Sequence, residues 1–286
     1  MRINHNISSM ITQGALFKTN RGLNQSLEKL STGLRVNRAS DDAAGLAISE
    51  NLRTQVRGAS QAQRNALDGI AALNIAEGAM NEISGILQRM RELSVQAAND
   101  TLTSTERLYT NQEFDQLTEE IDRISSVTNY NGMDLISDNT TAGARFGAGS
   151  TGSTLWIDAN EQYGQDSITI TIDTLTANSN GLNITGLTLT DQVSAQNSIS
   201  SIDEAIGSVN TVRANVGAFV NRLEHAVNNL MVSETNQQAA ESNIRDVDFA
   251  KETANFTKNQ ILSQSATAML AQSNMIPSTV LSLVTG

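Results

Sequence analysis

The residue types that could carry out catalysis are few and scattered. His5 and His225 are the only histidines in 286 residues, and neither stands in a metal-ligand spacing or in the company of a serine and an acid. The chain has no cysteine, which excludes disulfides, thiolate metal sites and thiol nucleophiles. The pattern favours surface or packing roles for both histidines and predicts a protein that is not an enzyme and binds no metal.

One glycine motif invites a cofactor interpretation. The segment from Gly147 to Gly152 matches G-x-G-x-x-G, and Asp173 follows about twenty residues later, as in dinucleotide-binding proteins. Such a site needs a buried strand before the motif and a helix after it. Here a polar run precedes the motif and the strand-like Leu155-Trp156-Ile157 follows it. We therefore expect a flexible turn and no cofactor.

Two close pairs of carboxylates are the remaining candidates. Asp41 with Asp42, and Asp246 with Asp248, could in principle bind a cation or perform acid–base work. No histidine or third ligand accompanies either pair, so capping of helix N-termini is the preferred interpretation. The side chains expected to neutralise them are Arg38 and Arg245.

Charge and composition exclude several classes of partner. The formal net charge of −11 argues against a nucleic acid and against an anionic membrane surface. Aromatic residues make up 3% of the chain and apolar residues 39%, a mixture that suits thin helical packing. No apolar run is long enough to cross a membrane, and residues 1–20 lack the apolar stretch of an ordinary secretion signal. If exported, the chain is expected to use another route.

The first half of the chain has helical periodicity. Apolar residues between 3 and 34 fall on one helical side, and this helix is interrupted by Gly33 and by residues 37–42. Ser40 or Asp41 is expected to cap the next helix, over residues 43–98. A further helix is predicted over residues 105–128, with an apolar stripe that includes Phe114 and Ile121.

The middle segment, about residues 130–196, is rich in Gly, Thr, Ser and Asn. Alternation over residues 167–172 and again over 187–190 predicts two strands, and Asn180-Gly181 between them is a hairpin-type turn signal. We expect a small β-hairpin region here with little hydrophobic core.

The last third carries the strongest periodic signal, a coiled-coil seam with spacings of three and four, followed by a final amphipathic helix over residues 246–272. The seam consists of Ile202, Ala205, Val209, Val212, Val216, Phe219, Leu223, Ala226 and Leu230.

Because one helix cannot bury such a stripe, N-terminal helices should pair with C-terminal ones. The predicted fold class is mainly α, with long antiparallel coiled-coil helices from both termini and a small β-hairpin region in the middle. The terminal pair should expose apolar surface and become ordered only against neighbouring copies.

Several ordered motifs at both ends resemble those of bacterial flagellins. They cover about the first 137 and the last 90 residues and are specific because they occur in order. They are Met1-Arg2-Ile3-Asn4-His5-Asn6, Glu28-Lys29-Leu30-Ser31-Thr32-Gly33, Asp41-Asp42-Ala43-Ala44-Gly45, Leu87-Gln88-Arg89-Met90-Arg91-Glu92-Leu93, Asn221-Arg222-Leu223-Glu224-His225, Ile244-Arg245-Asp246-Val247-Asp248 and Leu270-Ala271-Gln272-Ser273-Asn274. The middle does not carry the resemblance, and its shortness implies that large outer domains are absent.

The resemblance implies a homopolymeric subunit of the flagellar filament, located outside the cell. Residues 1–43 with 244–286 would form an inner tube, and residues 44–243, with their β region, an outer tube. The implied partners are the flagellar export apparatus, a chaperone on the C-terminal helix, the filament cap and hook-junction proteins, and the vertebrate toll-like receptor for flagellin.

The resemblance also assigns residues to these roles. Filament assembly would involve Ile3, Ile7, Leu23, Leu27, Leu30, Leu34, Leu262, Ala266, Met269, Ile276 and Leu283. The inter-domain connector would include Asn37, Arg38, Asp41, Asp42, Arg245 and Asp246. The receptor contact would be Gln88, Arg89, Leu93 and Glu113.

Three alternatives remain open at this point. A hook–filament junction protein has similar termini, but would join filaments without extending them. An enzyme that uses the glycine motif would bind a nucleotide saturably. A generic coiled-coil scaffold would not need both ends for assembly.

Overall fold

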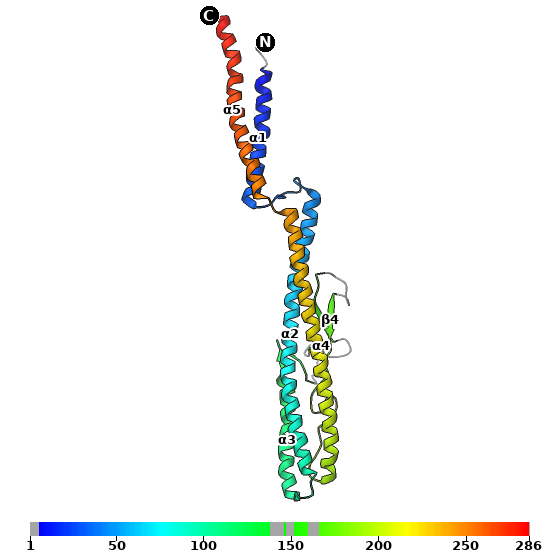
Figure 1. Ribbon diagram of the computed structural model, residues 1–286. Helices are drawn as coiled ribbons and strands as arrows, with labels where there is room; N and C mark the ends of the chain where they lie inside the picture. Colours follow the sequence, from blue (N-terminus) through cyan, green and yellow to red (C-terminus); the bar gives the residue numbers. More distant parts are fainter. Residues whose placement is uncertain (1–5, 138–145, 147–151, 160–165, 286) are drawn as a thin grey trace. The chain divides into compact units, whose positions relative to one another are not determined.

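The computed structural model describes residues 6–137, 146, 152–159 and 166–285, with side chains up to residue 275 (Figure 1). The chain divides into two compact units: residues 1–54 with 236–286, called here the terminal unit, and residues 55–235, called the central unit. The elements are α1 (Ile7–Thr32), α2 (Ala43–Ala97), α3 (Ser104–Val127), β1 (Asn129–Tyr130), β2 (Met133–Asp134), β3 (Ser153–Trp156), β4 (Ser167–Ile170), α4 (Gln192–Arg245) and α5 (Phe249–Thr285).

The mainly helical fold class is confirmed, and most predicted helix bounds agree within a few residues. The last helix differs from the prediction of residues 246–272. It is α5, which follows the end of α4 at Arg245 and extends beyond Pro277 to Thr285. The division into units falls inside α2 and α4, whereas the predicted domain boundaries lay at 43/44 and 243/244. The assignment of these parts to an inner and an outer tube stays a prediction.

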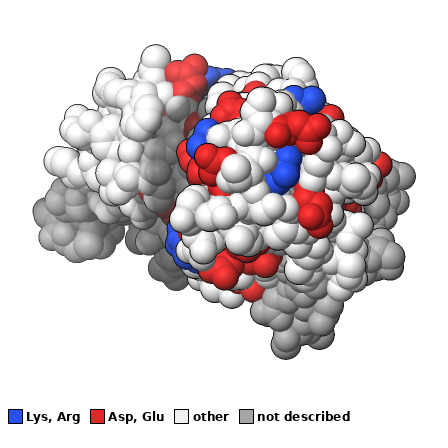
Figure 2. Space-filling model, turned by 90° about the horizontal axis from the view of Figure 1, so that it is seen from below, with Lys and Arg blue, Asp and Glu red and all other residues white. Residues whose placement is uncertain are grey.

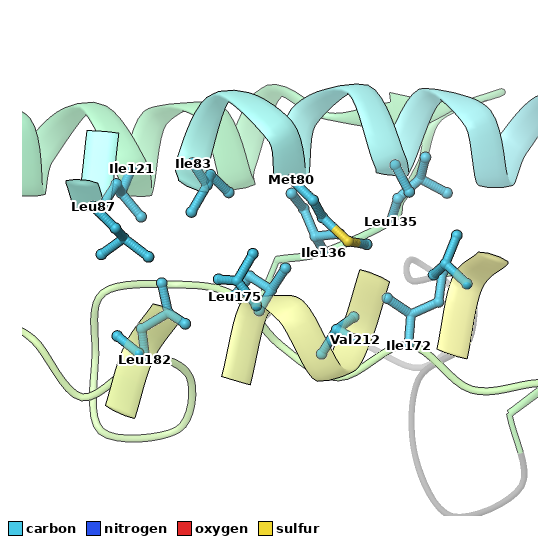
Figure 3. Close-up of a cluster of buried hydrophobic side chains, with 14 of the residues drawn as sticks. Met80, Ile83, Leu87, Ile121, Leu135, Ile136, Ile172, Leu175, Leu182 and Val212 are labelled. Carbon is cyan, nitrogen blue, oxygen red and sulfur yellow. The ribbon is translucent and has the colours of Figure 1, made fainter. Parts of the chain in front are cut away.

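The core of the central unit is built from three helices. Met80, Ile83 and Leu87 on α2 are fully buried, because spacings of three and four place them on one face. They meet Ile121 of α3 and Val212 of α4 (Figure 3). The seam predicted on α4 faces this core over most of its length, although Phe219 and Ala226 are only half-buried. Two interhelical ion pairs, Arg91 with Asp203 and Arg213 with Glu77, join α2 to α4 outside the core.

The strands of the middle segment pair differently from the prediction. β4 is formed as expected from the alternation, but its antiparallel partner is β3, with Leu155 opposite Ile168. Residues 187–190 form no strand, and Asn180-Gly181 lies in a turn rather than in a hairpin between two strands. A second, two-residue pairing joins β1 to β2 around Asn131-Gly132, where both residues have positive φ. This is the conformation that a tight hairpin turn requires.

The expectation of little core in the middle segment is wrong. Its side chains join the core formed by the helices, and those buried there are Leu135, Ile136, Phe146, Ile168, Ile170, Ile172, Leu175, Ala177, Leu182, Ile184 and Leu189. Polar side chains of α3 hold the backbone of this segment. Asp122 Oδ1 accepts from the N–H of Ala177 at 2.7 Å, and Asn111 Oδ1 accepts from the N–H of Leu189 at 2.7 Å. These bonds satisfy a buried irregular backbone that has no strand partner.

Capping side chains fix where the helices begin. Asp42 Oδ1 accepts from the N–H of Gly45, so Asp42, and not Ser40 or Asp41 as predicted, caps α2. Asp248 caps α5 by accepting from two N–H groups of its first turn. Thr103 and Glu106 form a reciprocal capping box at the start of α3. The capping interpretation of the acidic pairs is therefore confirmed for one member of each.

Two further observations from the sequence can be compared with the structure. No helix in the described part of the chain is both long and apolar enough to span a bilayer. The glycine motif lies outside the described residues except for Gly152, which has a φ of 60° and packs so closely on β4 that a Cβ would lie 2.4 Å from the carbonyl oxygen of Ile170.

A matched pair of isoleucines on α2 tests the core. Ile83→Ala should lower the free energy of unfolding by about 2–5 kcal/mol, because it leaves a cavity in a fully packed site. Ile75→Ala, at an exposed position of the same helix, should change it by less than about 1 kcal/mol. Urea unfolding followed by circular dichroism measures both, and equal losses would contradict this assignment of the core face.

The capping box predicts a dependence on pH. The hydrogen bond from the backbone N–H of Thr103, and then that from its hydroxyl, lowers the pKa of Glu106 below its ordinary value. A lowered folded-state pKa stabilises the fold at pH above the unfolded-state pKa, and this contribution is lost as the pH falls through the folded-state value. Glu106→Gln should therefore destabilise the protein at neutral pH, and its difference from the parent should disappear in acid. Glu204→Gln, at an exposed position inside α4, is the control for the substitution itself and should change the free energy of unfolding at neutral pH by less than about 0.5 kcal/mol.

Candidate assembly surface

In the terminal unit, α1 and α5 lie side by side as an antiparallel pair (Figure 1). Their buried or half-buried residues recur at spacings of three and four, as in a coiled-coil seam. On α1 these are Ser9, Thr12, Leu16, Thr19, Leu23, Ser26 and Leu30, and on α5 they are Glu252, Phe256, Asn259, Ser263, Ala266, Leu270 and Ser273. More than half of them are polar or small, so this seam buries little apolar surface.

Polar bonds set the register of the pair. Asn6 Nδ2 donates to the carbonyl oxygen of Ser273 at 2.9 Å, and Ser9 Oγ donates to Asn274 Oδ1 at 2.8 Å. Some three turns further along α1, Ser263 Oγ donates to Asn20 Oδ1 at 2.9 Å. Side chains from distant parts of the sequence thus align the two helices, although each exposed bond is worth only about 1 kcal/mol.

Large apolar side chains of the pair point away from this seam. Those exposed to solvent are Ile7, Met10, Ile11, Phe17 and Leu27 on α1, and Phe249, Ile261, Leu262, Met269 and Met275 on α5. An open groove follows the start of α5 from Phe249 to Leu262. Exposed apolar surface on this scale marks an interaction site.

The residues predicted for assembly fall into three groups. Ile7, Leu27, Leu262 and Met269 are exposed, while Leu23, Leu30, Leu34 and Ala266 are half-buried. Ile3 lies outside the described residues, and the side chains of Ile276 and Leu283 lie outside the described part of α5. Sequence reasoning did not single out Met10, Ile11, Phe17, Ile261 or Met275 for this surface, although all five are exposed.

The residues predicted as a connector come together within the terminal unit. The link between α1 and α2 pairs with the link between α4 and α5. The N–H of Arg35 donates to the carbonyl oxygen of Arg245 at 2.6 Å, and the N–H of Val247 donates to that of Gly33 at 3.0 Å. Val36 is buried beside this short ladder. Two chain segments more than 200 residues apart are therefore fastened through their backbones.

Side chains of the first link reinforce it. Asp41 Oδ2 accepts from the N–H groups of Asn37 and Arg38 at 3.2 and 3.1 Å. The expected pairing of Arg38 with the neighbouring acids is wrong, because its guanidinium binds Glu28 of α1 at 2.9 Å. Asp42 instead has Arg35 at 4.0 Å.

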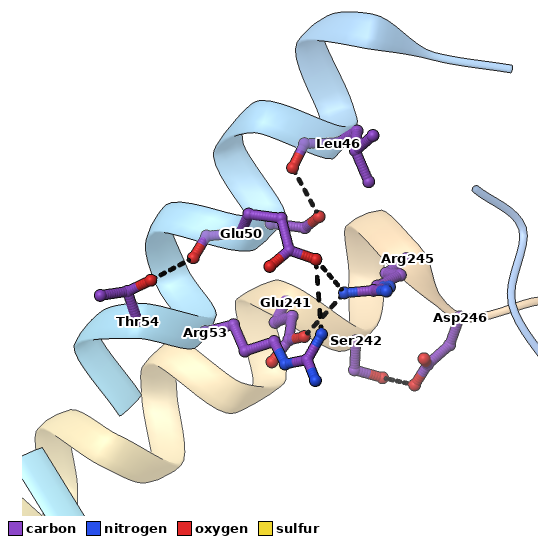
Figure 4. Close-up of polar contacts among 9 residues, drawn as sticks. Leu46, Glu50, Arg53, Thr54, Glu241, Ser242, Arg245 and Asp246 are labelled. Atoms are coloured by element: carbon purple, nitrogen blue, oxygen red, sulfur yellow. Dashed lines mark hydrogen bonds and ion pairs between the residues drawn. The ribbon is translucent and has the colours of Figure 1, made fainter. Parts of the chain in front are cut away.

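The second link is held by an ion-pair cluster on the ends of α2 and α4 that belong to the terminal unit (Figure 4). Arg245 Nη1 contacts Glu50 Oε1 at 2.8 Å and Glu241 Oε1 at 3.8 Å, and Arg53 shares the same Glu50 oxygen at 3.4 Å. The side chain of Arg245 is half-buried and that of Glu50 is exposed, so solvent reaches this ion pair and salt partly screens it. The predicted neutralisation of Asp246 by Arg245 is wrong, since Asp246 accepts from Ser242 Oγ at 2.7 Å.

The four residues predicted for the receptor contact do not share one exposed surface. Gln88, Arg89 and Glu113 are exposed on α2 and α3, where Arg89 Nε binds Glu113 Oε1 at 2.9 Å. The hydrogen bonds with Glu113 and then Glu92 raise the pKa of Arg89. Leu93, by contrast, is 1% exposed and belongs to the central core. It therefore offers no side-chain surface beside the other three.

Charged groups show no sign of a polyanion site on the face seen in Figure 2. Acidic and basic side chains are interspersed there among uncharged residues, without a basic patch. This distribution agrees with the net charge of −11. Recognition of a phosphate backbone would need clustered basic side chains.

Comparison with known proteins identifies the family. Residues 3–141 match the bacterial flagellin N-terminal helical region, and residues 199–284 match the bacterial flagellin C-terminal helical region. The chain is 44% identical to the flagellar filament 33 kDa core protein of Treponema phagedenis and 43% identical to a flagellin of Bacillus subtilis. Both alignments cover 99% of this chain and 100% of the relative. A crystal structure of Bacillus cereus flagellin matches with 32% identity and a TM-score of 0.47, over 62% of this chain and 94% of the other.

Matches at both ends account for most of the sequence, and the relatives agree over their whole length. They also fit the short middle segment, which leaves no room for large outer domains. The chain therefore belongs to the bacterial flagellin family and is a structural subunit of the flagellar filament.

Proposed function

We propose that the chain polymerises through the outward apolar face of the α1–α5 pair, which neighbouring copies cover in the filament. The observation that carries this proposal is the orientation of the two helices: their shared seam is largely polar, while residues such as Phe17 and Ile261 point to solvent. Burial of apolar surface contributes about 25 cal/mol per Å². A second copy with the same unsatisfied face is the simplest partner that can provide this burial.

The connector has a supporting role in this proposal. The ladder between the two links, and the ion pair of Arg245 with Glu50, hold the start of α5 against the end of α1. Neighbouring copies would then meet a preformed pair rather than two separate helices, which lowers the entropy lost on assembly.

Export and delivery follow from the same chemistry. An α1–α5 pair with a polar seam separates readily, which suits a chain that is passed unfolded through the flagellar export apparatus without a cleaved signal peptide. The exposed face of α5 would need a flagellin chaperone before export, and cap and hook-junction proteins would receive the chain at the filament end. Its final location is outside the cell. No catalytic activity is proposed, since the family is structural.

A contact with the vertebrate toll-like receptor for flagellin is proposed for the exposed part of the α2–α3 surface, that is, Gln88, Arg89 and Glu113. The ion pair of Arg89 with Glu113 presents both side chains in a fixed arrangement. Leu93 contributes by supporting α2 from the core and not by direct contact.

Assembly can be tested with two exposed aromatic residues. Phe17→Ala removes an outward side chain of α1, and Tyr109→Ala removes a similarly exposed ring from α3 in the central unit. Loss of a buried aromatic contact should raise the critical concentration for seeded polymerisation about tenfold or more for Phe17→Ala, and much less for Tyr109→Ala. Equal effects would contradict the assignment of the surface to α1 and α5. Failure of the parent chain to extend seeds would favour a hook–filament junction protein.

The connector can be tested by hydrogen exchange. Arg245→Met keeps the aliphatic stem but removes the charge that faces Glu50, so the amides of Arg35 and Val247 should exchange about tenfold faster or more. Arg53→Met is the matched control, because it contacts the same carboxylate from a more exposed position. Unchanged protection in Arg245→Met would mean that the backbone ladder needs no ionic support.

A further inference from the structure

All the sulfur in this protein is in methionine, and the described methionines differ in their exposure to solvent. The chain has eight methionines and no cysteine. Met80 and Met90 are 0% exposed in the central core. Met10 on α1 is 67% exposed and Met269 on α5 is 62% exposed, while Met231 in the central unit is 50% exposed. Met133 is half-buried. Oxidation of methionine depends on access to the thioether, so the exposed methionines are the most open to attack.

Met10 and Met269 lie at the same end of the α1–α5 pair. The bonds from Asn6 to Ser273 and from Ser9 to Asn274 place Met10 within about two turns of Met269 along the antiparallel helices. Met10 follows Ser9 of the seam, and successive residues of an α-helix are turned by about 100°, so its side chain leaves the seam and is exposed to solvent. Both thioethers thus belong to the exposed apolar residues of the pair that assembly is proposed to cover.

We propose that Met10 and Met269 form a reversible oxidation switch on polymerisation, with hydrogen peroxide as the oxidant. This inference rests on the proposed function, since the switch acts by changing the surface that neighbouring copies bury. Met275 lies at the same end and adds to the effect when oxidised.

The chemistry balances without a cofactor. A lone pair on the thioether sulfur attacks one oxygen of hydrogen peroxide, the O–O bond breaks, and a sulfur–oxygen bond forms. The sulfur is oxidised by two electrons, the peroxide is reduced, and the second oxygen leaves as water. The reverse step uses two thiols of a methionine sulfoxide reductase system, which take up the oxygen as water and become a disulfide.

The modification should affect the assembled and free states differently. In the monomer the sulfoxide stays in water, so the fold loses nothing. In the filament a strongly polar S=O group would be buried against apolar side chains, with an uncompensated desolvation penalty. Oxidation therefore shifts the equilibrium toward free subunits. By the same linkage, a neighbour that covers Met10 and Met269 protects them from peroxide.

The experiment uses the full-length chain and its Met10→Leu/Met269→Leu double variant, in which the volume and apolar character of both sites are kept. Monomers are treated with hydrogen peroxide, the oxidised positions are located by peptide mass spectrometry, and seeded polymerisation is measured before and after treatment. Oxidation of the parent should raise the critical concentration on the order of tenfold. The double variant should lose much less, and reductase with a thiol should restore the parent.

The control is Met231→Leu, which removes a comparably exposed thioether from outside the α1–α5 pair. It should remain as sensitive to peroxide as the parent. Assembled filaments should take up oxygen at Met231 faster than at Met10 and Met269. Peroxide-treated parent that polymerises normally with both sites oxidised would overturn the switch while leaving the proposed function intact. Untreated parent that never extends seeds would instead overturn the proposed function.

Discussion

The polar seam between α1 and α5 is the constraint on which the rest of the terminal unit depends. Two helices side by side can each turn only one face toward the other, and here that face carries Ser26, Asn259 and Ser273 among a few leucines. The larger apolar residues, including Ile11 and Phe17, are left facing water. Hydrogen bonds of Asn6 and Asn20 with α5 give the pair a defined register. The pair still leaves apolar surface exposed, so association with other copies would be favourable.

The central unit solves the same problem within one chain. Its helices α2, α3 and α4 present stripes of similar spacing, but the middle segment folds across them and completes the cover. Ile170, Ile172 and Leu175 do there what a neighbouring subunit is proposed to do for α1 and α5. The two units therefore share one kind of helical pattern and differ in whether the chain supplies a third layer. This difference accounts for the closed core of the central unit and for the exposed apolar side chains of the terminal unit.

Much of this fold could be predicted because helical periodicity is a local property. The seam from Ile202 to Leu230 and the stripe around Ile83 were identified from spacing alone, and they are buried as expected except for the half-buried Phe219 and Ala226. The strand predicted at residues 187–190 failed because alternation records only which side chains are buried. Leu189 is buried, but its N–H is satisfied by the side chain of Asn111, a contact 78 residues away that no local pattern reveals. The cap at Asp42 was displaced by one residue for a similar reason, since Asp41 is occupied by the N–H groups of Asn37 and Arg38.

The exposed apolar residues of α1 and α5 could not be identified from hydrophobic spacing alone. Leu23 and Leu30 have the spacing of an interaction stripe, and the fold places them in the seam of the chain's own helix pair. Phe17 and Met10 do not continue that stripe, and they are the residues left exposed. Hydrophobic spacing tells which residues need cover, but not whether the cover comes from the same chain or from another copy. That choice depends on the register set by Asn6, Ser9 and Asn20 with their partners on α5, and such long-range polar contacts become visible only in three dimensions. In this protein, therefore, small polar residues decide which apolar residues face outward.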